Sequence, residues 1–161
     1  MSSPLPAILV FAISLLLALL VAVYPLSPAV SVYRPELLCL VVIYWALYSP
    51  HQIGVGVAWC LGLLQDLVED AVWGGHALAL ALVAYIGAMS YRRLRTYSMT
   101  QQAFWIFVFV GIHQIFVNWI QGLNGYAAPA RYLIASALVS TVCWPLLVLL
   151  MRIVQQRYRI F

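Results

Sequence analysis

Three of the four acidic residues in this 161-residue chain fall within five consecutive positions, and a histidine follows soon after them. The acids are Asp66, Glu69 and Asp70, and the histidine is His76, beyond a Gly-Gly pair. Carboxylates one helical turn apart beside an imidazole suit acid–base catalysis, such as hydrolysis of a lipid-linked substrate, or metal binding. The spacing is specific for neither, because no HExxH pair, serine elbow or phosphate-binding loop accompanies it. We therefore predict no catalytic residue, no metal site and no cofactor.

Two of these carboxylates continue a row of small residues along one predicted helix face. Small residues let the backbone of another helix approach closely, whereas carboxylates in a membrane need partners or water. At 1.5 Å per residue, the first carboxylate lies about 6 Å deeper along the helix than the second. We predict that this face is a docking surface for another helix, or one wall of a pocket. The row consists of Gly54, Ala58, Gly62, Asp66 and Asp70.

The composition excludes a water-soluble domain with a polar surface. Hydrophobic residues make up 66% of the chain and charged residues 7%, and the mean hydropathy is +1.01. These values are typical of a polytopic membrane protein. Its eight basic residues are all arginines, and their clustering indicates membrane topology, with no nucleic-acid partner expected. Cys39, Cys60 and Cys143 lie in apolar stretches without disulfide or zinc spacing, so we expect them to be small core residues.

Apolar runs separated by turn-rich stretches predict one all-α transmembrane domain over residues 1–161, with six helices. A Ser-Pro-His-Gln turn at 49–52 should make the second and third helices an antiparallel hairpin. The second helix is short, so either it begins before Pro35 or its Arg34 and Glu36 end is sunk below the membrane surface. We expect residues 25–34 to form an interfacial loop. The helices are expected at about 6–24, 36–48, 53–70, 75–91, 101–121 and 131–151.

The distribution of arginine predicts the orientation of these helices. Arginines flank one set of helix ends much more densely than the other, and loops rich in arginine stay in the cytoplasm. Both termini are therefore expected to be cytoplasmic, and the acidic end of the third helix faces outward. The inner group is Arg92, Arg93, Arg95, Arg152, Arg157 and Arg159, and the outer group is Arg34 and Arg131.

The outer ends of the second and third helices carry opposite charges. Because the hairpin makes these ends neighbours, we predict an arginine–carboxylate pair there, Arg34 with Asp66. Asp66 is expected to lock the third helix to the second or to a partner. The alternative is that the charges of this region lie exposed among lipid headgroups. This alternative fits Glu69 and Asp70 better than the deeper Asp66.

The fifth predicted helix carries a second polar stripe. Its members follow at spacings of three, four and three residues, which places them on one face. Amides inside a membrane usually bond to a neighbouring helix, and a water-filled pocket or a groove for a partner helix is the alternative. The stripe consists of Gly111, Gln114, Asn118 and Gln121, with His113 beside it. In the last helix, Ser136, Ser140 and Trp144 form a similar row.

The stretch from Arg34 to Tyr85 resembles the MreD family of bacterial rod-shape-determining membrane proteins. The family pattern has an Arg-Pro opening the second helix, a Pro-terminated turn, a Gly-rich third helix ending in GxxxD and a later Gly. The similarity extends to WPLLVLLMR at 144–152. The family's polar or acidic residue midway along the fifth helix is matched here only by His113 and Gln114. The motif residues in this chain are Arg34, Pro35, Gly54, Gly62, Asp66 and Gly75.

This resemblance implies a non-enzymatic, multi-pass component of the bacterial cytoplasmic (inner) membrane that binds the single-pass protein MreC. Through MreC it implies a link to the glycosyltransferase RodA, its transpeptidase and the actin-like MreB, and so to lateral peptidoglycan synthesis and rod shape. The family fold is similar to the membrane S-components of energy-coupling vitamin transporters. That likeness suggests the alternative function, a subunit that binds a small molecule or lipid-linked precursor in a pocket containing Arg34 and Asp66.

Overall fold

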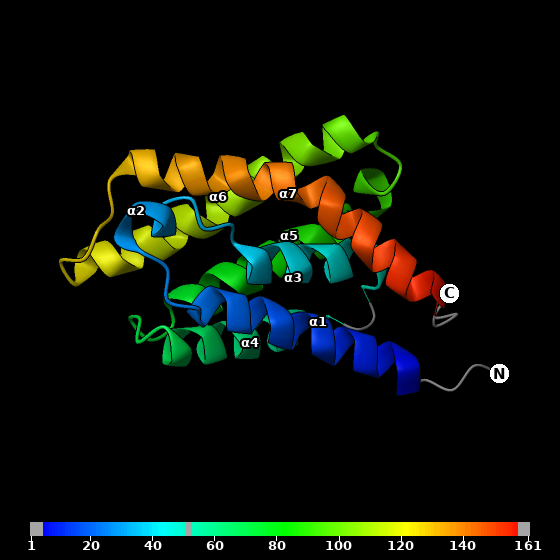
Figure 1. Cartoon of the computed structure of the whole chain (residues 1–161), viewed down its shortest axis with the longest axis horizontal. Helices are drawn as coiled ribbons and strands as arrows, with labels where there is room; N and C mark the ends of the chain where they lie inside the picture. Colours follow the sequence, from blue (N-terminus) through cyan, green and yellow to red (C-terminus); the bar gives the residue numbers. More distant parts are fainter. Residues whose placement is uncertain (1–4, 51–52, 158–161) are drawn as a thin grey trace.

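The computed structural model describes residues 5–50 and 53–157, and every regular element within these ranges is an α-helix. The all-α prediction is thus confirmed for the described residues. His51 and Gln52 of the predicted turn, and Arg159 of the inner arginine group, lie outside them. The helices are α1 (Leu5–Val23), α2 (Pro28–Ser31), α3 (Leu37–Tyr48), α4 (Val55–Val68), α5 (Gly75–Leu94), α6 (Met99–Leu123) and α7 (Ala130–Arg157) (Figure 1).

Local chemistry accounts for several helix boundaries. The short α2 lies in the stretch expected as a loop, with Pro28 at its start, where a missing N–H is harmless. The helix α6 begins earlier than expected because Ser98 and Gln101 form a capping box, in which each side chain bonds the backbone N–H of the other. Apart from the short α2, the described residues form six helices of 12 or more residues, and these lie at the positions of the six predicted helices. Among the described residues, α5, α6 and α7 are long and apolar enough to cross a membrane. The helices α3 and α4 are apolar but shorter, with 12 and 14 residues.

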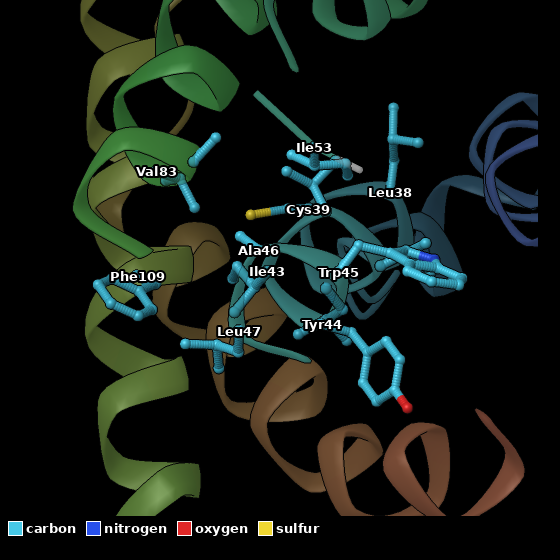
Figure 2. Packing of buried hydrophobic residues seen from close by; sticks show 14 of the residues in the cluster. Leu38, Cys39, Ile43, Tyr44, Trp45, Ala46, Leu47, Ile53, Val83 and Phe109 are labelled. Atoms are coloured by element: carbon cyan, nitrogen blue, oxygen red, sulfur yellow. The ribbon is translucent and has the colours of Figure 1, made fainter. Parts of the chain in front are cut away.

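The short helix α3 occupies the centre of the bundle. Its residues from Leu38 to Leu47 are all buried, as expected for a helix that is hydrophobic on every side. Figure 2 shows its side chains pointing outward around the helix, with Val83 of α5 and Phe109 of α6 among the surrounding residues. Its 12 residues extend about 18 Å. The helix begins at Leu37, after Pro35. The first of the two alternatives, a start before Pro35, is therefore wrong.

Helix neighbours differ from those predicted. α4 packs against α5, and α3 packs against α5 and α1, while contact between α3 and α4 is marginal among the described residues. The predicted packing of the second and third helices as a hairpin pair is therefore wrong. The helices α5, α6 and α7 pack in sequence order. In addition, Cys60 is exposed on α4, in contrast to the predicted core position.

The two termini lie at one end of the bundle, and α2, the α4–α5 turn and the α6–α7 loop lie at the other (Figure 1). We call the latter the acidic end, because the chain's acidic residues belong to the segments that meet there. These residues are Glu36, Asp66, Glu69 and Asp70.

Candidate functional site

Asp66 lies in the last turn of α4, is 1% exposed, and is bound by the first turn of α5. Its Oδ2 accepts hydrogen bonds from the N–H groups of Gly74 (2.8 Å) and Ala77 (3.4 Å). Its Oδ1 accepts one from the His76 N–H (3.0 Å) and lies 2.8 Å from His76 Nδ1. The first N–H groups of a helix have no partner within the helix, and that end carries a partial positive charge. Asp66 therefore caps α5 from the neighbouring helix.

Gly62 lies one turn before Asp66 on the same face of α4 and allows this close approach. A Cβ atom built on Gly62 would be 2.3 Å from Ala77 Cα and 2.5 Å from the His76 carbonyl oxygen. Only glycine fits without moving one of the two backbones. The turn that brings α5 there needs a second glycine, because Gly74 adopts a φ of +94°. Gly62 thus positions the first turn of α5, and Asp66 binds it.

Arg34 does not pair with Asp66. Its guanidinium donates hydrogen bonds to the carbonyl oxygens of Ala22 and Tyr24, at the end of α1. The last carbonyls of a helix have no internal partner, and a cation there also complements the helix dipole. The predicted Arg34–Asp66 lock is therefore wrong: Arg34 holds the end of α1, while Asp66 holds the start of α5.

Only part of the predicted row of small residues and carboxylates forms a contact face on α4. Ala58 is fully buried and Gly62 contacts α5 directly. Gly54, in contrast, is the residue preceding α4, and a Cβ atom there would meet open space. Asp70 lies beyond the end of α4 with a φ of +51° and is exposed. The docking face is thus limited to the part of α4 from Ala58 to Asp66, and its partner is α5 of the same chain.

A cavity of about 560 Å³ lies at the acidic end, between the α2–α3 segment, the end of α4, and the helices α5, α6 and α7. Its carboxylates come from Glu36 and Glu69, whereas Asp66 is not among the lining residues. The pocket predicted around Arg34 and Asp66 therefore contains the first residue but not the second. The chief polar lining residues are Arg34, Glu36, Glu69, His76, His113 and Gln114.

The polar stripe on α6 both packs the helix and lines the cavity. Gln114 donates to Ser136 Oγ of α7 (2.8 Å), and its Nε2 is 3.5 Å from Glu36 Oε1. The Asn118 amide bonds both backbone groups of Ala128, at 2.7 Å and 3.3 Å, and so holds the α6–α7 loop. Gln121 and Asn118 also line the cavity. A Cβ atom built on Gly111 would meet no atom within 4 Å, so no close helix contact depends on this glycine.

His113 is the most isolated polar residue of the site. It is 1% exposed, and neither ring nitrogen has a hydrogen-bond partner. Its ring lines the cavity, with its centre 5.7 Å from that of His76. A buried imidazole normally has a partner for its donor and for its acceptor nitrogen, so His113 is an unsatisfied polar group in the wall of the cavity.

Two serines of α7 hold the segment that leads into α3. Ser136 Oγ donates to the Arg34 carbonyl oxygen (2.7 Å), and the Glu36 N–H donates to Ser140 Oγ (2.9 Å). Their one-turn spacing was visible in the sequence, but their target was not, because it is backbone from a distant part of the chain. They place Glu36 at the cavity.

The family model described as rod shape-determining protein MreD matches residues 4–154, nearly the whole chain. The chain belongs to the MreD family. A rod shape-determining protein MreD from Haemophilus influenzae is 29% identical over 144 residues, which cover 89% of each chain. No solved structure matches.

The positions that match the MreD pattern have different roles in the structure. Gly62 and Asp66 form the contact between α4 and α5 described above. Pro35 precedes Glu36, which occupies the N-cap position of α3 without a side-chain cap bond, so Pro35 lies just outside the helix. Gly75 begins α5, but a Cβ atom there would be 3.7 Å from its nearest neighbour, an ordinary contact. The glycine that the turn requires is Gly74.

Proposed function

We propose that this chain is a non-enzymatic, integral scaffold of the bacterial cell-elongation complex that binds MreC. Through MreC it supports RodA, its transpeptidase and MreB in lateral peptidoglycan synthesis and so in rod shape. The observation that carries the proposal is the family match over residues 4–154. In the cell it is a multi-pass protein of the cytoplasmic membrane with six spans and both termini inside, because the arginines flank the end that holds the termini.

The surface that we assign to MreC is the outer face of α1. This helix packs on the bundle mainly through α3, and it leaves an apolar groove of about 350 Å³ against α7. Ile13 and Leu17 line this groove and are 52% and 56% exposed. A groove between two apolar helices accepts the side chains of a third, so a single transmembrane helix is the partner that fits it.

The experiment combines co-purification with site-specific photo-crosslinking. A photoreactive residue at Ile13 or Leu17 is compared with one at Val142, which is 76% exposed on α7 and does not line the groove. We expect MreC to co-purify with the tagged chain and to crosslink at Ile13 and Leu17 but not at Val142. Failure of the unaltered chain to retain MreC would contradict the scaffold function. Retention with crosslinks at Val142 alone would contradict only the assigned surface.

A second candidate function is favoured by the 560 Å³ cavity. We infer that a chain with such a cavity could instead bind a small molecule or lipid-linked precursor, as S-components of vitamin transporters do. Native mass spectrometry of gently extracted protein tests this. A retained ligand is expected, and Leu133→Trp, which places a large ring in the cavity lining, should remove it. Absence of any retained mass from the unaltered chain would contradict this function.

A further inference from the structure

The cavity at the acidic end has an uncompensated negative charge. Asp66 is paired with His76 and with backbone donors of α5. Glu69 accepts a hydrogen bond from Gln65 (2.9 Å), and its second oxygen lies 3.7 Å from His76 Nε2. Glu36 has only the 3.5 Å contact with Gln114, and within residues 5–50 and 53–157 no cation forms an ion pair with it.

Arg34 also lines the cavity, and its positive charge can offset only one of the two carboxylates there, Glu36 and Glu69. Its two terminal nitrogens donate to carbonyl oxygens at the end of α1, which turns the guanidinium toward that helix end. A carboxylate in a largely apolar environment requires a counter-charge or must become neutral. The place for a counter-charge is the cavity between Glu36 and Glu69, which line it from the start of α3 and the end of α4.

A second, independent observation also indicates a ligand. Both ring nitrogens of His113 and the Oε1 of Gln114 are buried without a hydrogen-bond partner, and both side chains line the same cavity. Buried polar atoms in native proteins are nearly always paired. A ligand with polar groups in addition to its positive charge supplies the missing partners.

The size of the cavity and the types of side chain exclude a bare ion as the fitting occupant. The volume of about 560 Å³ is far above the roughly 30 Å³ of one water molecule, and it falls among the volumes of small-molecule sites. In the described part of the chain, no group of three His, Cys, Asp or Glu side chains is arranged to hold a metal ion. An organic cation fits both observations.

We propose that this cavity binds an organic ammonium group, with the charged nitrogen between Glu36 and Glu69 and neighbouring polar groups bonded to His113 and Gln114. A free amine and the ethanolamine headgroup of a lipid offer the same chemistry. The site lies apart from the α1 groove assigned to MreC, so this proposal and the scaffold function stand or fall separately. It rests on the second candidate function, with which it shares the cavity, and names the class of ligand.

The test uses the full chain in nanodiscs of phosphatidylglycerol, which has no amine. In one arm, ethanolamine is titrated against its neutral isostere, ethylene glycol. In the other, phosphatidylethanolamine replaces part of the phosphatidylglycerol. Thermal unfolding and native mass spectrometry report binding. We expect saturable stabilisation by the amine-bearing compound in at least one arm, and the arm that responds identifies the source as a free amine or a lipid.

Charge variants assign the effect to the cavity. Glu36→Gln should weaken the apparent affinity at least tenfold, and Glu69→Gln provides the same test if the first variant does not fold. Asp70→Asn is the matched control, because Asp70 is exposed at the same end and does not line the cavity; its affinity should stay unchanged. The proposal would be overturned if ethanolamine stabilised the chain no more than ethylene glycol does and phosphatidylethanolamine had no saturable effect. Unchanged affinity in a folded Glu36 or Glu69 variant would also overturn it. MreC retention is measured in parallel and should not change.

Discussion

The hydrogen bonds of Asp66 explain why this acidic residue is buried in an apolar bundle. Asp66 binds three backbone N–H groups and one imidazole nitrogen, from Gly74, which directly precedes α5, and from the first turn of α5. Water would otherwise have to solvate those donors, and little water reaches this position because Asp66 is buried. The carboxylate is thus a structural part of the fold.

Replacing this carboxylate by an amide tests its capping role. In Asp66→Asn, an NH₂ group takes the place of one acceptor oxygen and faces backbone N–H donors, so hydrogen bonds are lost without a change in size. We expect the free energy of unfolding in mild detergent to fall by about 1–2 kcal/mol. Asp70→Asn is the control, because that residue is exposed and its φ of +51° is one that asparagine tolerates; it should have no measurable effect. Equal stability of the two variants would contradict the capping role.

At the scale of the elements, the contact between α4 and α5 depends on the absence of a side chain at one position. A Cβ atom on Gly62 would overlap the backbone of α5. Gly56, six residues earlier in the same helix, has no neighbour within 4 Å of a Cβ atom. The two glycines therefore differ in their tertiary environment although both lie in α4.

This pair gives a matched comparison. Gly62→Ala should lower the free energy of unfolding by about 1–3 kcal/mol or more, because the helices must separate and the bonds of Asp66 to α5 lengthen. Gly56→Ala should be neutral or stabilising by up to about 1 kcal/mol, because alanine favours the helix more than glycine does. Thermal unfolding of both variants in the same detergent measures this difference in stability. A Gly62→Ala protein as stable as the unaltered chain would show that α4 and α5 do not approach this closely.

For the whole molecule, charge is divided between the two ends of the bundle. The acidic residues meet at the cavity end, and the arginines that end α5 and lie near the end of α7 flank the end that holds the termini. Arginine-rich ends remain in the cytoplasm, so the cavity should open on the outer side of the membrane.

Cysteine labelling in intact cells tests this orientation. In a chain whose three native cysteines are replaced, Asn124→Cys lies in the α6–α7 loop at the cavity end and Thr96→Cys in the α5–α6 connection at the other end; both positions are exposed. A membrane-impermeant maleimide should label the first without permeabilisation and the second only after it. The reverse pattern would invert the topology, and labelling of both in intact cells would contradict a spanning bundle.

Much of the fold could be predicted from the sequence because apolar run length determines where a membrane helix lies. The six main helices occupy the predicted stretches, and the i, i+4 spacing correctly placed Gly62 and Asp66 on one helix face. Boundaries that depend on local caps were less accurate. The helix α6 starts at its capping box, and α3 starts two residues after Pro35.

The sequence by itself determined which residues had to find partners: a row of small residues, a deep carboxylate, an arginine and a stripe of amides. Only the tertiary structure decided which partners they found. Backbone N–H groups at helix starts bind a carboxylate and C=O groups at helix ends bind a guanidinium, and every helix offers them. Asp66 therefore binds α5 and Arg34 binds α1, which leaves Glu36 and His113 facing the cavity.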